Sequence, residues 1–169
     1  MSTKAKTIIL NHDDILLKVE RMATQVVELN PSAKRIILVG IENKGLVVAQ
    51  LVKSALTAIR DIEIVIGSIN IDKRNPDPDN ARLSGLESTK DEHVILIDDV
   101  LNSGRTMMYA SLPIMKQSPK SLHTLFLANR DHASFPIKAS IVGISLATTL
   151  QEHITFDIDE KGQMTVYLT

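Results

Sequence analysis

One segment near the middle of the chain, HVILIDDVLNSGRT (residues 93–106), holds side chains that suit sugar-phosphate chemistry. An apolar run leads into the adjacent carboxylates Asp98 and Asp99, which can accept hydrogen bonds from the vicinal hydroxyls of a ribose. A turn of small and polar residues then opens a helix, so backbone N–H groups and hydroxyls can converge on a phosphate dianion. The segment therefore predicts a site for ribose 5-phosphate. Its phosphate turn consists of Asn102, Ser103, Gly104, Arg105 and Thr106.

Each half of this segment also has an ordinary structural interpretation. Acid pairs at strand ends often only solvate a loop, and Ser-Gly turns often only cap a helix. Their combination at this spacing favours a binding site. The GxxxxGK[ST] loop and the GxGxxG fingerprint are both absent, which argues against adenine-nucleotide motors and nicotinamide enzymes.

The elements around the acid pair alternate between helix and strand. Apolar residues at helical spacing, with Asn11 as the N-cap, predict an amphipathic helix over residues 12–30. The run RIILVGI (residues 35–41) predicts a strand buried on both faces, and a right-handed crossover makes the strand after it parallel. This pattern predicts an α/β fold with a mostly parallel central sheet flanked by helices. The other expected elements are helices at 46–59 and 106–116 and strands at 62–71, 94–97, 121–128, 141–146, 153–158 and 164–168.

The strand at residues 94–97 places the acid pair. In open α/β sheets ligands bind beyond the carboxyl ends of the strands, so Asp98 and Asp99 are expected at the binding edge. Residues 72–90 show no sustained period, and a segment of that length without structure is typical of a lid or binding loop. A plain surface insertion is the alternative interpretation of residues 72–90.

Composition narrows the class of protein. The chain has 169 residues, is 44% hydrophobic and carries a formal net charge of −1, which fits one domain without an overall basic bias. It has no cysteine, so disulfides, thiolate nucleophiles and Cys-ligated zinc are excluded. It also lacks tryptophan, an apolar run of signal-peptide length and a membrane-spanning stretch. We expect a soluble, cytoplasmic protein.

The segment VILIDDVLNSGRT resembles the phosphoribosyl pyrophosphate (PRPP) motif of type I phosphoribosyltransferases. More of the chain is similar to one branch, the PyrR family of pyrimidine-operon attenuators and uracil phosphoribosyltransferases. That similarity includes ILVGIENKG, IGSINI and NRDHASFPIKASIVGISLATT, in the family's order. The resemblance implies a type I phosphoribosyltransferase fold over residues 1–169, with a small C-terminal β hood and a lid at about 72–90.

The resemblance also implies roles for individual residues. Asp98 and Asp99 would bind the ribose hydroxyls of PRPP, and the phosphate turn would bind its 5'-phosphate. The lid would bring cations to the departing diphosphate, although each of them alone also fits an ordinary solvated charge. These lid candidates are Lys73, Arg74 and Arg82. The implied diphosphate loop consists of Ile41, Glu42, Asn43, Lys44 and Gly45, with Lys44 where the family usually has arginine.

Base recognition and cofactor follow from the same resemblance. Arg130 and Asp131 correspond to a region near the base pocket, although the family's Asp-Arg order is shifted here to Asn-Arg-Asp. Magnesium is the expected cofactor, bound through PRPP and with no direct protein ligand assigned. The expected activity is transfer of phosphoribose from PRPP to a nucleobase, with uracil as the expected base, in a homodimer or larger homo-oligomer.

Two other functions fit parts of the sequence. The first is an RNA-binding regulator of pyrimidine genes that keeps the nucleotide site only as a sensor. RNA binding needs local positive charge, yet residues 12–30 hold two bases against four acids, and residues 130–160 hold two against five, so RNA is not expected as a partner. The second is a phosphorylation receiver domain. In a receiver the acid-bearing strand would open the domain, whereas here two strand-helix units precede it.

Overall fold

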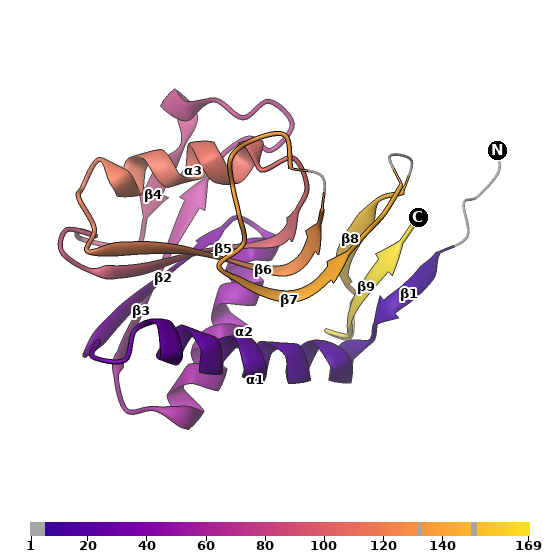
Figure 1. The fold of residues 1–169 in the computed structure, drawn as a ribbon, viewed down its shortest axis with the longest axis horizontal. Helices are drawn as coiled ribbons and strands as arrows, with labels where there is room; N and C mark the ends of the chain where they lie inside the picture. Colours follow the sequence, from indigo (N-terminus) through magenta and orange to yellow (C-terminus); the bar gives the residue numbers. More distant parts are fainter. Residues whose placement is uncertain (1–5, 132, 150–151) are drawn as a thin grey trace.

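A six-stranded sheet in the order β4-β3-β2-β5-β6-β7 forms the centre of the computed structural model, which describes residues 6–131, 133–149 and 152–169 (Figure 1). Every neighbouring pair of strands is parallel except β3 with β4. The predicted α/β fold with a mostly parallel sheet is therefore confirmed. The strands are β2 (Arg35–Ile41), β3 (Glu63–Asn70), β4 (Arg82–Ser84), β5 (His93–Leu101), β6 (Ser121–Arg130) and β7 (Ile141–Leu146).

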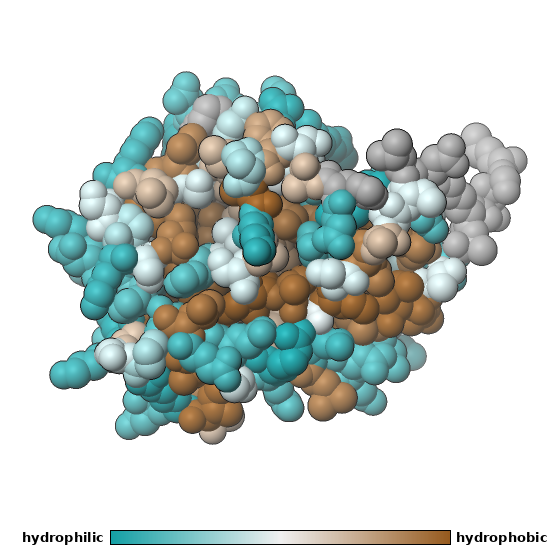
Figure 2. Space-filling view, viewed as in Figure 1, coloured by the Kyte–Doolittle hydropathy of each residue, from teal (hydrophilic) through white to brown (hydrophobic). Residues whose placement is uncertain are grey.

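Helices cover both faces of this sheet (Figure 1). Helices α1 (His12–Leu29) and α2 (Lys44–Ile59) lie on one face, and α3 (Arg105–Met115) lies on the other. The N-cap predicted at Asn11 is confirmed, because its side chain and that of Asp14 form a capping box. Figure 2 shows hydrophilic side chains along α1 and a hydrophobic band beside it, as expected for an amphipathic helix. Among the described residues, no helix is both long and apolar enough to cross a membrane.

A small antiparallel sheet, the hood, lies beside the large one and has the order β1-β9-β8. Its strands are β1 (Thr7–Leu10), β8 (Ile154–Ile158) and β9 (Met164–Leu168). The hood was expected from C-terminal residues alone, but its third strand comes from the N-terminal end of the chain. Thr7 pairs with Leu168, a contact between chain ends that no local pattern predicts.

The lid expected at residues 72–90 has more structure than its sequence pattern indicates. It contains a short 3₁₀ turn (Pro78–Asn80) and β4, which pairs antiparallel with β3. Ala81 of this segment, and Ile71 just before it, are buried in the same core cluster as residues of α3. The expectation of a structureless segment was wrong because its apolar anchors are too few and too irregularly spaced to form a periodic pattern.

Candidate functional site

The acid pair lies within β5, a central strand between β2 and β6. The sequence placed Asp98 and Asp99 just after the strand, but β5 continues to Leu101 and holds them in extended backbone. Asp98 is 5% exposed, and its Oδ1 accepts a hydrogen bond of 2.9 Å from the Asp99 N–H. Gly45 at the start of α2 passes so close that a Cβ there would lie 2.7 Å from the Ile97 carbonyl oxygen. Glycine is therefore required at this approach.

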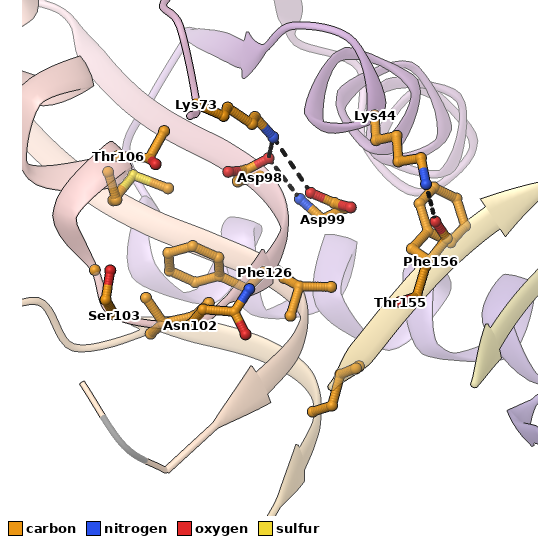
Figure 3. A pocket seen from close by; sticks show the side chains of 15 residues that line it. Lys44, Lys73, Asp98, Asp99, Asn102, Ser103, Thr106, Phe126, Thr155 and Phe156 are labelled. Atoms are coloured by element: carbon orange, nitrogen blue, oxygen red, sulfur yellow. Dashed lines mark hydrogen bonds and ion pairs between the residues drawn. The ribbon is translucent and has the colours of Figure 1, made fainter. Parts of the chain in front are cut away.

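A lysine from the lid contacts both carboxylates (Figure 3). Lys73 Nζ lies 2.6 Å from Asp98 Oδ1 and 3.4 Å from Asp99 Oδ1. Burial and the charge of Asp99 raise the pKa of Asp98 to about 8, against the attraction of Lys73. Burial alone would lower the pKa of Lys73, but the two carboxylates outweigh it and raise that pKa. The acid pair therefore favours holding one proton near neutral pH, and the ammonium balances the remaining charge.

The phosphate turn connects β5 to α3. Gly104, at φ 82°, is the N-cap residue of α3 and makes no side-chain cap, while the Arg105 N–H donates to Ser103 Oγ at 3.3 Å. The Ser103 carbonyl accepts hydrogen bonds of 3.0 Å from the N–H groups of Ser134 and Phe135, which hold the turn in place. The other N–H groups of this helix N-terminus and its positive dipole end can bind an anion. The guanidinium of Arg105 lies over the Tyr109 ring, 5.6 Å from the ring centroid.

The predicted diphosphate loop joins β2 to α2. The Glu42 carboxylate accepts hydrogen bonds from Ser68 Oγ at 3.0 Å and Asn70 Nδ2 at 2.8 Å, so it is held toward β3. The Lys44 ammonium donates to the Phe156 carbonyl oxygen. The diphosphate loop is thereby joined to the hood.

The acid pair, most of the phosphate turn and the lysines Lys44 and Lys73 line one cavity of 380 Å³ (Figure 3). Strand β5, the phosphate turn and α3 form one wall, and β8 of the hood forms the opposite one. Its polar lining residues are Lys44, Lys73, Asp98, Asp99, Asn102, Ser103, Thr106 and Thr155, and the others are Val100, Leu101, Gly104, Met107, Phe126, Ile154 and Phe156.

Several predicted site residues lie outside the cavity lining. Arg82 donates to backbone carbonyls of Asp79 and Ala81 within the lid, and Arg74 is exposed. Arg130 donates to Thr148 Oγ1 at 2.8 Å and the Thr149 carbonyl at 2.7 Å, while Asp131 accepts from Asn129. The structure therefore does not bring the predicted base-pocket residues Arg130 and Asp131 to the cavity. Ile41, Glu42, Asn43, Gly45 and Arg105 also lie outside the lining, although Asn43 and Gly45 flank Lys44 and Arg105 lies between Gly104 and Thr106.

Sequence reasoning missed the apolar wall of the cavity. Phe126 pairs with Asp98 in the register of β5 and β6, and Ile154, Thr155 and Phe156 come from the hood. The sequence could have indicated Phe126 to within one position, because aligning the starts of the two expected parallel strands, residues 94 and 121, places the residue before Phe126 beside Asp98. No local signal indicated the hood residues, since they approach the acid pair only through the fold.

The comparison with protein families decides the class of this site. The model of the phosphoribosyl transferase domain family matches residues 6–161. This chain belongs to the phosphoribosyltransferase family. Among curated relatives, this phosphoribosyltransferase is 31% identical over 171 residues to the bifunctional protein PyrR of Oceanobacillus iheyensis, covering 95% of this chain and 94% of the relative. It is 32% identical over 165 residues to that of a Geobacter species, covering 92% and 93%. The resemblance to the PyrR family is thus confirmed.

Solved structures support the same fold. The hypoxanthine phosphoribosyltransferase of Trypanosoma cruzi superposes with a TM-score of 0.76 at 15% identity, covering 95% of each chain. A structure of that enzyme in complex with its product IMP gives a TM-score of 0.75 at 14% identity and covers 88% of this phosphoribosyltransferase and 84% of that chain. At these identities the likeness shows the fold alone.

Proposed function

We propose that this phosphoribosyltransferase transfers phosphoribose from PRPP to a nucleobase, and that uracil is its base. One observation carries the proposal. The acid pair Asp98 and Asp99 and the N-terminus of α3 line the same 380 Å³ cavity. A ribose 5-phosphate needs acceptors for its hydroxyls at one end and an anion site at the other, and this cavity offers both.

Different parts of the site bind different parts of PRPP. Asp98 and Asp99 accept hydrogen bonds from the 2'- and 3'-hydroxyls of the ribose. The phosphate turn and the first N–H groups of α3 bind the 5'-phosphate, with Ser103 and Thr106 as hydroxyl donors. The loop from Ile41 to Gly45 lies beside the leaving diphosphate, and Lys44 is the loop's cation in the cavity lining.

In the reaction the bond between C1 and the diphosphate oxygen breaks, and its electron pair leaves with the diphosphate. A ring nitrogen of the base forms the new bond to C1, and its proton passes to the departing diphosphate or to water. The transition state has oxocarbenium character, so the carboxylates near the ribose and the cations near the diphosphate stabilise opposite charges. The apolar hood wall, with Phe156 and Ile154, excludes water that would otherwise attack C1.

Magnesium fits this site only together with the substrate. Among the described residues, no three His, Cys, Asp or Glu side chains are grouped closely enough to hold a metal ion. Two adjacent carboxylates with phosphate oxygens are, however, the donor set that magnesium prefers when it accompanies a phosphorylated substrate. The expected metal would be held chiefly by PRPP, with Asp98 and Asp99 facing it. When bound, it would neutralise charge on the diphosphate.

Uracil is proposed as the base because of the resemblance to the PyrR family. The structure itself does not identify a base-binding pocket among the described residues. Phe126 and Phe156 line the cavity, but they are 1% and 0% exposed, so they shape its wall and leave little ring surface for a planar base. Arg130 and Asp131 lie outside the cavity lining and are engaged by Thr148 and Asn129.

An assay of pyrophosphate release tests the proposal. The protein is supplied with PRPP and magnesium and, in separate reactions, with uracil, cytosine, hypoxanthine, guanine or adenine. Uracil-dependent release that disappears in Asp98→Asn supports the proposal. Release with a purine alone would retain a phosphoribosyltransferase but overturn uracil as its base. PRPP binding without release for any base would overturn the enzymatic function.

A further inference from the structure

The lid cation Lys73 contacts both carboxylates of the acid pair (Figure 3). Its ammonium lies within 3.4 Å of an oxygen of each carboxylate, the atoms assigned above to the ribose hydroxyls. A ribose bound there would have to take the hydrogen-bonding positions that Lys73 now fills. This contact thus competes with the substrate for the same oxygens.

Contacts of the lid on both sides of Lys73 hold it beside the acid pair. Two residues before it, Ile71 is 6% exposed, and Pro76 is buried three residues after it. The Asp72 carboxylate accepts a hydrogen bond of 2.9 Å from the Arg74 N–H, which tightens the turn that carries Lys73. Beyond this turn, Ser84 of β4 pairs with Ser68 of β3. The lid is therefore anchored at several points on both sides of Lys73.

The acid pair gives this contact its strength. The side chains of Asp98 and Asp99 are 7% and 14% exposed, so water screens them little. Two adjacent carboxylates in such surroundings repel each other unless a cation or a proton intervenes. Lys73 is 36% exposed at its side chain, so its ammonium can be drawn out into solvent without breaking a packed core.

We propose that Lys73 is a specificity residue that makes the site prefer PRPP over ribose 5-phosphate and other phosphoribosyl compounds without a diphosphate. This inference rests on the proposed function. Every ligand must displace the ammonium from the acid pair. PRPP compensates for the displacement, because its diphosphate gives the released ammonium a new anionic partner. Ribose 5-phosphate and a nucleoside monophosphate product give it none, so they bind weakly and leave readily.

The test compares dissociation constants for ribose 5-phosphate and for PRPP with magnesium, measured by calorimetry on the whole chain. Lys73→Gln should bind ribose 5-phosphate about tenfold more tightly than wild type, the factor equivalent to the low end of one charge-assisted hydrogen bond. The same variant should bind PRPP no more tightly than wild type, so the preference for PRPP collapses. Lys73→Arg, which keeps a cation, should retain most of the preference.

Lys90→Gln is the matched control, because it removes one exposed positive charge from the same segment without touching the acid pair. It should leave both dissociation constants unchanged. If wild type binds PRPP but Lys73→Gln binds ribose 5-phosphate no more tightly than wild type, the specificity role is overturned and the proposed function stands. If wild type binds neither ligand, the proposed function fails and the role of Lys73 fails with it. Thermal unfolding of each variant confirms that the comparison is made on folded protein.

Discussion

The Lys44 ammonium lies 3.7 Å from the Asp157 carboxylate and donates to the neighbouring carbonyl of Phe156, so a residue of the diphosphate loop is tied to the hood. The side chains are 40% and 55% exposed, which makes their ion pair a surface interaction of small net worth. The ion pair matters because, with the carbonyl contact, it fixes the position of Lys44. The cation expected to face the diphosphate rests on the strand that forms the opposite wall of the cavity.

Removing the carboxylate partner of Lys44 should therefore change stability and PRPP affinity little, whereas removing Lys44 itself should weaken PRPP binding. We expect Asp157→Asn to change the free energy of unfolding by at most about 0.5 kcal/mol, as for other exposed ion pairs. Its affinity for PRPP should stay equal or rise slightly, because Lys44 keeps its contact with the Phe156 carbonyl and loses only a competing carboxylate. Lys44→Ala should lower PRPP affinity in the same titration. Equal losses of affinity in both variants would show that the contact itself, rather than the free cation, serves binding.

Replacing the buried acid should separate binding from stability. Because the pKa of Asp98 is raised in the folded protein, the folded state holds its proton more tightly than the unfolded chain does. Wild-type stability attributable to this group should therefore fall as pH rises from about 5 to about 8. Asp98→Asn removes the titration, so its melting temperature relative to wild type should rise across that range.

The measurement for Asp98→Asn is thermal unfolding at several pH values without metal or ligand, where each kcal/mol corresponds to about 2–4 °C for a chain of this size. Comparing the two proteins at each pH cancels the titrating groups that lie away from Asp98. PRPP binding by the variant should be lost at every pH. A constant difference in melting temperature from pH 5 to 8 would contradict the raised pKa.

The close approach of α2 to the acid pair predicts a stability cost at Gly45. A Cβ there would lie 2.7 Å from the Ile97 carbonyl and 3.0 Å from Asp98 Oδ1, both parts of a central strand. We expect Gly45→Ala to lower the free energy of unfolding by about 1–3 kcal/mol in urea titrations, as for other overpacked sites. Gly162→Asn serves as the control, since its surroundings are open and asparagine tolerates the φ of 78° there. An unchanged midpoint for Gly45→Ala would show that the strand yields easily.

How far the sequence predicted the site depends on how local each part is. Asp98 and Asp99 share one segment with the phosphate turn, so spacing alone places them together. Lys73 was a candidate on the lid, but an isolated lysine in a polar loop could equally have been a solvated charge. Its contact with Asp98 spans 25 positions and depends on where the lid packs.

Contacts between residues far apart in the chain could not be predicted from local sequence patterns. Lys44 and Phe156 are 112 positions apart, and their contact exists only because the hood packs beside the sheet. Strand β1 joins the hood for the same reason, since its four residues cannot indicate a pairing partner. The overall fold was predictable because buried parallel strands appear in the sequence as continuous apolar runs. The contact partners of exposed and polar residues leave no such pattern.

The last prediction concerns RNA, because the structure further reduces the positive charge available on α1. RNA affinity at physiological salt depends on basic side chains that are free to contact phosphates. Arg21, one of two bases on α1, already donates to the carbonyls of Val142 at 2.7 Å and Gly143 at 2.8 Å. Arg130 is likewise engaged by Thr148 and Thr149.

We therefore expect no specific RNA complex tighter than about 10 micromolar, within the range of nonspecific binding on the order of 10⁻⁴ to 10⁻⁶ M. The measurement is a filter-binding titration with a pyrimidine-leader hairpin, with and without a uridine nucleotide, at two salt concentrations. Arg21→Gln should leave the weak binding unchanged, because its guanidinium serves the protein's own carbonyls. Submicromolar binding that tightens with nucleotide would instead make this chain an RNA-binding regulator, and a loss of that binding in Arg21→Gln would place the RNA on α1.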